Sequence, residues 1–291
     1  MTTKPAFLQQ LKTFSKQIED VLEHILPPPA TRLHEAMRYS VLGGGKRLRS
    51  FFVWAASQLY DVEPTQALKA AAALELIQSY SLVHDDLPCM DNADMRRGKP
   101  SCHKVFGEAT ATLVGDALIP LAFETLSSLD VTPQIRLELI ESLAHTIGST
   151  GLVAGQMRDL DQEEWPRTFM GLVELQYLKT GILFGFAMEA GAILGSASVT
   201  ERNSLKAYGI LFGQAFQMKD DWLDGHGDEA TLGKPAGQDA EKFTFLTLLG
   251  PDLLHERAEN SITEAIRELH SFGERAAPLR EAALYVMTQG K

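Results

Sequence analysis

Hydrophobic residues recur with a helical period along most of the chain. In the N-terminal segment 7–25 they are spaced i, i+3, i+4, which predicts an amphipathic helix that the prolines at 27–29 are expected to end. The apolar positions of this segment are Phe7, Leu8, Leu11, Phe14, Ile18, Val21, Leu22 and Ile25. The same period predicts further helices over 67–86, 134–149, 171–195, 206–224, 251–272 and 276–289.

Signals for other kinds of structure are weak. Runs of alternating β-branched residues are absent, so we expect an all-α fold. The glycine-rich stretches 43–45 and 225–227 are expected to form turns. Since no linker rich in Ser or Pro and no internal repeat divides the chain, a single domain over 1–291 is predicted, organised as a helical bundle.

The segment from Gly181 to Val199 is nearly all apolar and close to the length of about 20 residues that spans a bilayer. It contains Glu189 and several glycines, and its flanks show no clear positive bias. A helix that is apolar all round can also form the buried centre of a large helical protein. We therefore expect a core helix here and no membrane span.

Composition limits the partners and the compartment. The net charge of −11 makes nucleic acid an unfavourable partner, and 45% hydrophobic residues suffice for a large core. The start of the chain has no apolar signal-like stretch, and the two cysteines, Cys89 and Cys102, have no metal-type His-Cys spacing around them. Reduced thiols and a cytoplasmic location are expected.

Two aspartate clusters, about 135 residues apart, carry the candidate chemistry. Asp220 and Asp224 are four apart, so a helix places both carboxylates on one face, where they repel unless a cation lies between them. In the first cluster, Asp85 and Asp91 are six apart and would lie on different faces of an ideal helix. Pro88 is expected to end the helix near Leu87, so that Asp91 folds back towards Asp85.

Carboxylate ligands without neighbouring His or Cys suit a hard cation, most simply Mg²⁺. Mg²⁺ usually keeps waters and combines one or two carboxylates with substrate phosphates. Arg96 and Arg97 directly follow the first cluster, so the two clusters together predict a clamp for a diphosphate. A solvated acidic helix face is the alternative for either cluster, but both clusters follow apolar stretches.

Other cations precede and follow the two clusters along the chain, and their order together with the carboxylates is what suggests a phosphate site. The turn at 43–45 leads into Lys46, Arg47 and Arg49 at an expected helix start, where backbone donors and the helix dipole favour an anion. Lys179-Thr180 precedes the apolar segment, and Gly233-Lys234 follows the second cluster. Each alone is equally compatible with a solvated surface.

In combination these motifs resemble the short-chain trans-prenyltransferases of the polyprenyl synthetase family, most of all the bacterial farnesyl diphosphate synthases. The resemblance runs over nearly the whole chain. It rests on Gly-Gly-Gly-Lys-Arg-Leu-Arg at 43–49, Ser-Leu-Val-His-Asp-Asp-Leu-Pro-Cys-Met-Asp at 81–91, Arg-Arg-Gly-Lys-Pro at 96–100 and Phe-Gln-Met-Lys-Asp-Asp-Trp-Leu-Asp at 216–224. It implies an isoprenoid-synthase helical fold, a homodimer, and a central cavity faced by both aspartate motifs.

The resemblance also implies a reaction and roles for single residues. An allylic diphosphate, dimethylallyl or geranyl, ionises, the double bond of isopentenyl diphosphate attacks, and a proton is lost to the departing diphosphate. Three Mg²⁺ ions per site would be held by Asp85, Asp86, Asp91, Asp220 and Asp224, with Asp221 in the same motif. The substrate-binding residues would be Lys46, Arg49, Gln78, Arg96, Arg97, Lys179, Thr180, Gln217 and Lys234, and those at the reacting cation would be Lys179, Thr180 and Gln217.

The chain departs from the family pattern in three places. Gln78 stands where the family commonly has a His that touches isopentenyl diphosphate, and Gln can donate a hydrogen bond but carries no charge. The spacing from Asp239 to Lys242 is two residues shorter than usual, which leaves the role of Lys242 open. Ala93 replaces a frequent Asp beside the first motif.

Product length separates the remaining alternatives. Tyr80, five residues before Asp85, would block the deep end of the chain cavity, whereas its neighbour Ser81 is too small to do so. This favours a farnesyl product of fifteen carbons, with a geranylgeranyl synthase as the close rival. A non-catalytic partner subunit generally loses one aspartate motif, and a terpene cyclase usually has Asn, Ser and Glu in its second motif. A phosphohydrolase is suggested only by His84-Asp85.

Overall fold

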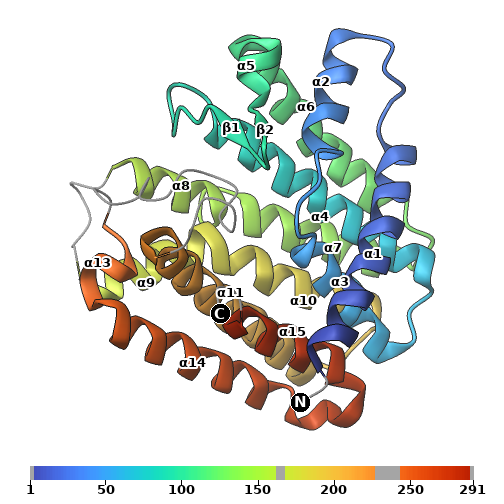
Figure 1. Ribbon diagram of the computed structural model, residues 1–291. Coiled ribbons are helices and arrows are strands. Elements are labelled where there is room, and N and C mark those ends of the chain that lie inside the picture. The colour runs from blue at the N-terminus through green and yellow to red at the C-terminus, as the bar shows by residue number, and fades with distance from the viewer. Residues whose placement is uncertain (1–2, 162–167, 227–242, 289–291) are drawn as a thin grey trace.

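The computed structural model describes residues 3–161, 168–226 and 243–288 and consists of helices around a helical core (Figure 1). The N-terminal half contains α1 (Thr3–Ile25), α2 (Arg32–Val41), α3 (Leu48–Ser57), α4 (Pro64–Asp85), α5 (Cys102–Phe106), α6 (Glu108–Ser127) and α7 (Pro133–Ile147). The C-terminal half contains α8 (Leu152–Leu160), α9 (Phe169–Gln176), α10 (Ile182–Leu194), α11 (Val199–His226), α13 (Phe245–Leu249), α14 (Pro251–Glu268) and α15 (Ala277–Thr288). The predicted all-α fold is confirmed.

Short elements complete the chain. Two-residue strands β1 (Met95–Arg96) and β2 (Lys99–Pro100) pair antiparallel in a hairpin. A π-helical turn, Tyr177–Gly181, joins α9 to α10, and 3₁₀ turns occupy Gln58–Tyr60 and His270–Ala276. Within the described residues the hairpin is the only sheet.

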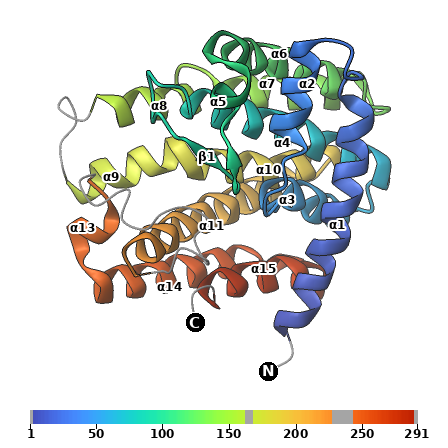
Figure 2. The same cartoon turned by 45° about the horizontal axis from the view of Figure 1, so that its top comes forward.

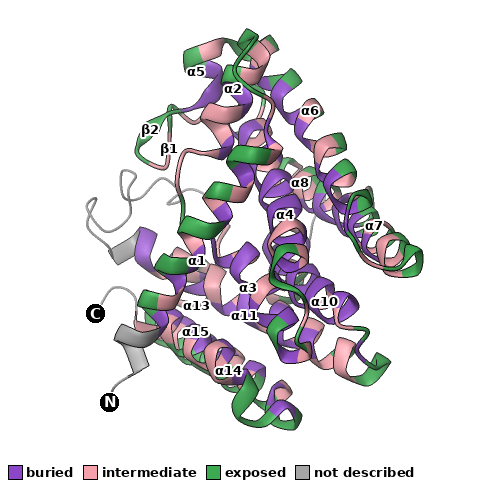
Figure 3. Ribbon diagram, turned by 90° about the vertical axis from the view of Figure 1, so that its right-hand side faces the viewer, coloured by how far each residue is buried: buried purple, intermediate pink, exposed green. Residues whose placement is uncertain are grey.

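The core forms around α10, which is buried along almost its whole length. It packs against α11, α3 and α7, while α4 packs against α6 and α3. In Figure 2, α10 and α11 lie between α6 and α7 on one side and α14 and α15 on the other, and Figure 3 shows buried residues concentrated on α4, α10 and α11. The rings of Phe52 and Phe212, 4.5 Å apart between centroids and nearly perpendicular, fix α3 against α11.

The apolar segment that suggested a core helix is confirmed as one. By length and composition alone, two helical stretches could cross a membrane, Glu108–Ser127 and Phe169–Leu194. The most apolar window of the second is 83% buried inside the protein, whereas that of Glu108–Ser127 is only 39% buried. A helix that is covered by its own protein needs no lipid, so the 83% burial of the Phe169–Leu194 window agrees with a core role.

Several helix boundaries differ from the sequence prediction. The predicted helix 171–195 contains the π-helical turn, and the predicted helix 206–224 begins earlier, at Val199. The predicted helix 251–272 ends at Glu268, because the chain enters a 3₁₀ turn in which Gly273 has a φ of 56°. Of α3 only the start after the 43–45 turn was predicted, and α2, α5, α6, α8 and α13 were not predicted. In α6 the internal Pro120 obscures the periodic signal.

Candidate active site

The first aspartate motif lies where α4 ends. The helix stops at Asp85, and the amide of Asp91 donates a hydrogen bond to the Asp85 carbonyl oxygen at 2.9 Å. Asn92, with a φ of 48°, reverses the chain, and its amide bonds to the carbonyl of Leu87 at 3.0 Å. The predicted helix end before Pro88 and the return of Asp91 towards Asp85 are both confirmed.

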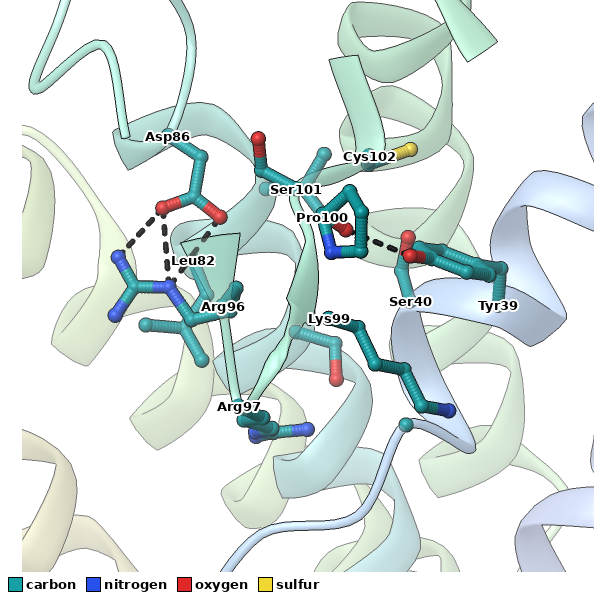
Figure 4. A pocket seen from close by; sticks show the side chains of 13 residues that line it. Tyr39, Ser40, Leu82, Asp86, Arg96, Arg97, Lys99, Pro100, Ser101 and Cys102 are labelled. Carbon is teal, nitrogen blue, oxygen red and sulfur yellow. Dashed lines mark hydrogen bonds and ion pairs between the residues drawn. The ribbon is translucent and has the colours of Figure 1, made fainter. Parts of the chain in front are cut away.

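Asp86 points to the hairpin. Its Oδ1 accepts hydrogen bonds from Nε and Nη2 of Arg96 at 3.0 and 2.5 Å, as Figure 4 shows. The carboxylate is buried, and burial raises its pKa while the hydrogen bond from Arg96 opposes that shift. The structure thus pairs Asp86 and Arg96, which the sequence had assigned to metal and diphosphate respectively.

The second motif lies on α11, near the end of the helix. Oδ1 of Asp221 accepts a hydrogen bond from Gln217 Nε2 at 2.9 Å, and its Oδ2 accepts one from the Phe245 amide at 2.9 Å. Asp221 therefore ties α11 to the start of α13. Burial lowers the pKa of Arg49, and the charges of Glu75 and of the neighbouring Asp220 oppose that shift.

The π-helical turn carries Lys179 and Thr180 to the same region. Thr180 Oγ1 donates to Gln217 Oε1 at 3.1 Å, which links the turn to α11. Lys179 forms an ion pair with Asp159 of α8, and its charge lowers the pKa of Asp85. Gly155 makes this possible, because a Cβ there would lie 2.7 Å from the Lys179 amide nitrogen. π-helical turns are often found at functional sites, as here.

The predicted phosphate-binding cations lie around the 43–49 turn. Lys46 is exposed, with Nζ 5.7 Å from the centroid of the Phe216 ring. The guanidinium of Arg49 lies 4.5 Å from the centroid of the Phe184 ring, and burial lowers the pKa of Arg49 to about 10. A Cβ on Gly45, which has a φ of +121°, would lie 3.0 Å from Cζ of Arg97. Glycine there lets the Arg97 guanidinium lie against the turn.

Three predicted residues lie on the last turns of α4. Gln78 is buried, and among the described residues its Oε1 has no hydrogen-bond partner. The buried ring of Tyr80 stands edge-on to His84 with centroids 5.8 Å apart, and burial together with the charge of Asp85 raises its pKa to about 12. Ser81 Oγ donates to the Gln78 carbonyl at 3.1 Å.

Some predicted positions cannot be placed in this way. Lys234, Asp239 and Lys242 lie outside the described residues. Asp159, which holds Lys179, was not predicted, since an ordinary acidic helix residue gives no signal by itself. A pocket of about 30 Å³ beside the hairpin was also not predicted. It is lined by Asp86, Arg97, Lys99 and Cys102, among others, and Tyr39 donates to Pro100 at its edge (Figure 4).

The carboxylates suit a cation that substrate helps to hold. Burial raises the pKa of Asp85 to about 6, with Asp91 and Asp86 acting in the same direction and Lys179 and Arg96 against it. A divalent cation would relieve this crowding of negative charge. In the described ranges, no three His, Cys, Asp or Glu side chains form a ready-made metal site. Mg²⁺ in general takes few protein ligands and completes its shell with water and phosphate.

Comparison with known proteins gives the family. The polyprenyl synthetase family matches residues 30–277. Geranylgeranyl pyrophosphate synthase 7 of Arabidopsis thaliana is 44% identical over 262 residues, 88% of this chain and 76% of the relative, and geranylgeranyl pyrophosphate synthase 4 is 39% identical over 274 residues, 92% and 73%. An FPP/GFPP synthase from Zymomonas mobilis, solved in apo form, superposes with a TM-score of 0.88 at 43% identity, over 97% of this chain and 99% of that one.

The chain therefore belongs to the polyprenyl synthetase family, and it is a short-chain trans-prenyltransferase with the isoprenoid-synthase helical fold. The resemblance drawn from the sequence is confirmed at this level. The expected farnesyl product is not confirmed. The curated relatives above are named for the geranylgeranyl product, which favours the alternative of a geranylgeranyl synthase.

Proposed function

We propose that this enzyme condenses isopentenyl diphosphate with an allylic diphosphate, and that the two aspartate motifs and the surrounding cations form its active site. One observation carries the proposal. The hydrogen bond from Thr180 to Gln217 joins the π-helical turn to α11, and Lys46 of the 43–49 turn lies over the Phe216 ring of α11. The charge of Lys179 in the π-helical turn also acts on Asp85 at the end of α4.

Asp85, Asp91, Asp220 and Asp224 would hold Mg²⁺, which supplies Lewis-acid stabilisation of negative charge on the diphosphate. Asp86 and Asp221 contribute differently, because Arg96 occupies the first and the Phe245 amide binds the second. We assign Asp86 to fixing Arg96 beside the site and Asp221 to fixing Gln217.

In the reaction, the C1–O bond of the allylic substrate breaks and its electron pair leaves with the diphosphate. The double bond of isopentenyl diphosphate then forms the new bond to C1, and the resulting cation loses a proton to the departing diphosphate. Lys179 and Arg96 would place positive charge near the diphosphate, where negative charge develops. Such electrostatic stabilisation is usually the largest source of rate enhancement in a step of this kind. The oxygens of Thr180 and Gln217 face the allylic cation.

Lys46, Arg49 and Arg97 would bind isopentenyl diphosphate. In the described part of the chain, Arg49 Nε is buried and donates no hydrogen bond, so it has a donor available for a phosphate oxygen. Gln78 on α4 would add a neutral hydrogen-bond donor in place of a charged one. Lys234 is assigned to the allylic diphosphate from the sequence resemblance alone.

For the product, the buried Tyr80 ring supports fifteen carbons, because it stands on α4 upstream of Asp85, where the growing chain would extend. A twenty-carbon product is the second candidate, and the names of the curated relatives support it more directly. Incubation with isopentenyl diphosphate, each allylic primer and Mg²⁺, followed by chromatography of the dephosphorylated products, tests both. Release of phosphate without a condensed product would refute the proposed reaction.

We also propose a homodimer and a cytoplasmic location. α6 is apolar enough to pass for a membrane helix but is largely uncovered in the single chain, with Leu113 55% exposed, so a second copy would bury it. Both cysteines are free thiols, as a reducing compartment requires. Analytical ultracentrifugation tests the first proposal and cell fractionation the second.

A further inference from the structure

A buried ion pair lies beneath the 43–49 turn. Arg47 Nη1 and Glu75 Oε2 are 2.6 Å apart, and the two residues are only 3% and 2% exposed. Arg47 Nη2 also donates to the carbonyl of Val41 at 2.8 Å. The family resemblance assigns a role to neither residue, and the burial of Arg47 removes it from the phosphate-binding cations expected at this turn. Since well-packed apolar residues can replace a buried ion pair without loss of stability, stability alone does not account for these two charges.

Arg47 shapes the turn. It has a φ of 51° and a ψ of 28° at the start of α3, a left-handed conformation that is unfavourable for a residue with a side chain. Its carbonyl accepts hydrogen bonds from Ser50 Oγ and the Phe51 amide, both at 3.0 Å. Its side chain runs inward to Glu75, whereas the preceding Lys46 is exposed. The ion pair therefore anchors the turn from inside the protein.

Glu75 also acts on the other two guanidinium groups of this region. Burial lowers the pKa of Arg49 and of Arg97, and in both cases the charge of Glu75 is the largest opposing influence. Arg97 in turn lies against the turn at Gly45. The buried carboxylate of Glu75 therefore bonds to Arg47 and acts through its charge on Arg49 and Arg97. Without it the three guanidinium groups would repel one another.

The position of Glu75 on α4 completes the relationship. It precedes Gln78 by three residues, so both lie on one face of the helix, one turn apart. We propose that Glu75 is a positioning residue for the isopentenyl diphosphate site: it fixes the 43–49 turn through Arg47 and holds the guanidinium groups of Arg49 and Arg97 side by side. This inference rests on the proposed function and adds a residue that touches no substrate.

The test must separate positioning from folding. Glu75→Gln leaves the buried Arg47 with only the half-exposed carboxylate of Glu19, 3.7 Å from its Nη2, as a counter-charge, so this variant can fail to fold. The double variant Arg47→Met/Glu75→Leu replaces both charges by apolar side chains of similar volume and is expected to melt cooperatively near the wild-type temperature. Its KM for isopentenyl diphosphate should rise at least about tenfold, while the KM for the allylic substrate changes less than about twofold.

Binding measured without turnover gives the second readout. Calorimetric titration with isopentenyl diphosphate alone should show the same weakening in the double variant, and Glu75→Asp, which keeps the charge, should bind with intermediate affinity. The matched control is Arg202→Met/Glu138→Leu, an ion pair of 2.6 Å between α11 and α7, which should leave both KM values unchanged.

Three outcomes would overturn the inference. A folded double variant with wild-type affinity for isopentenyl diphosphate would show that the pair only supports the fold. Equal losses for both substrates, or a double variant that does not fold while Glu75→Asp binds like wild type, would do the same. Failure of the proposed function is recognised separately, because the wild-type enzyme would then form no condensed product.

Discussion

Lys179 of the π-helical turn forms an ion pair with Asp159 of α8, and both side chains are partly buried. Burial raises the pKa of Asp85, and the charge of Lys179 opposes that shift. One lysine therefore stands between two carboxylates of different function, the unpredicted Asp159 and the proposed metal ligand Asp85. If Asp85 holds a cation, the ion pair with Asp159 would keep Lys179 from competing with it.

Asp159→Asn should make the enzyme need more magnesium. Without the charge on Asp159, Lys179 is drawn to Asp85 and competes with the cation there. A partly exposed ion pair is worth about 1 kcal/mol, so we expect a roughly fivefold rise in the Mg²⁺ concentration for half-maximal rate. A Mg²⁺ titration of the initial rate measures this.

The control for this variant is the ion pair of the neighbouring residue on α8. Arg158 and Glu174 form an ion pair of 2.7 Å between α8 and α9, and Glu174→Gln should leave the Mg²⁺ dependence unchanged. An unaltered Mg²⁺ requirement in Asp159→Asn would show that Asp159 and Asp85 do not compete for Lys179.

The aspartates should divide into two groups on mutation. Asp85→Ala is expected to lower turnover at least about a hundredfold without loss of fold, since it removes stabilisation of the departing charge. Chelation of Mg²⁺ by EDTA should have the same effect on the wild type. Asp221→Asn should instead weaken the attachment of α13, because the Phe245 amide loses a carboxylate acceptor. Rates together with circular-dichroism melting distinguish the groups, and a near-normal rate for Asp85→Ala would refute the metal assignment.

Gln78→His should strengthen binding of isopentenyl diphosphate. A charge-assisted hydrogen bond contributes about 1.5–3 kcal/mol, so the KM for this substrate should fall roughly tenfold. The KM for the allylic substrate should not follow. Steady-state kinetics with each substrate varied in turn gives the result, and an unchanged KM for isopentenyl diphosphate would mean that position 78 makes no such contact.

Tyr208 should stabilise the folded protein at neutral pH and lose part of this contribution at alkaline pH. Its fully buried hydroxyl donates to the Leu279 carbonyl at 2.7 Å, and burial raises its pKa well above the ordinary value of 10. A raised pKa in the folded state means that this stabilisation is complete below about pH 10 and declines as the pH rises further, by up to about 1.4 kcal/mol per unit. Urea unfolding between pH 8 and 11 measures the decline, which should be shallower in Tyr208→Phe.

At neutral pH, Tyr208→Phe should cost about 1–2 kcal/mol of unfolding free energy, because the Leu279 carbonyl is left without its donor. An equal pH slope in the variant and the wild type would show that Tyr208 does not cause the alkaline loss.

The local features of the site could be predicted from sequence, and the pairings across the fold could not. Pro88 and the spacing of Asp85 and Asp91 were enough to predict the helix end and the return of the chain, because both follow from backbone chemistry within a few residues. The pairs Lys179–Asp159 and Arg47–Glu75 join positions 20 and 28 apart, and no periodicity indicates which acidic residue meets which cation.

The same distinction explains the errors in the fold. The π-helical turn at 177–181 lies inside a continuous apolar pattern, and its wider winding depends on packing against α8 and α11. The two-residue strands of the hairpin are too short to show alternation, yet they bring Arg96 to Asp86. Both features belong to tertiary structure and both lie at the site.

Tyr80 should set the length of the product. It lies five positions before Asp85 on α4, roughly 7 Å along the helix axis. We expect a chain that grows away from the diphosphate along α4 to meet its ring. A close-packed interior does not easily yield to further isoprene units. Tyr80→Ala should therefore shift the main product from fifteen carbons to twenty or more, as measured by chromatography of the dephosphorylated products.

Three companion variants make this result decisive. Tyr80→Phe keeps the ring and should keep the wild-type product, whereas Tyr80→Leu, which leaves a smaller cavity than alanine, should give a mixture even if the alanine variant is unstable. Ser81→Ala changes little volume and should have no effect on length. A wild type that already makes mostly twenty-carbon product would show that the ring does not limit the chain, and would favour the geranylgeranyl reading. An active Tyr80→Ala variant that still stops at fifteen carbons would place the limit on another residue.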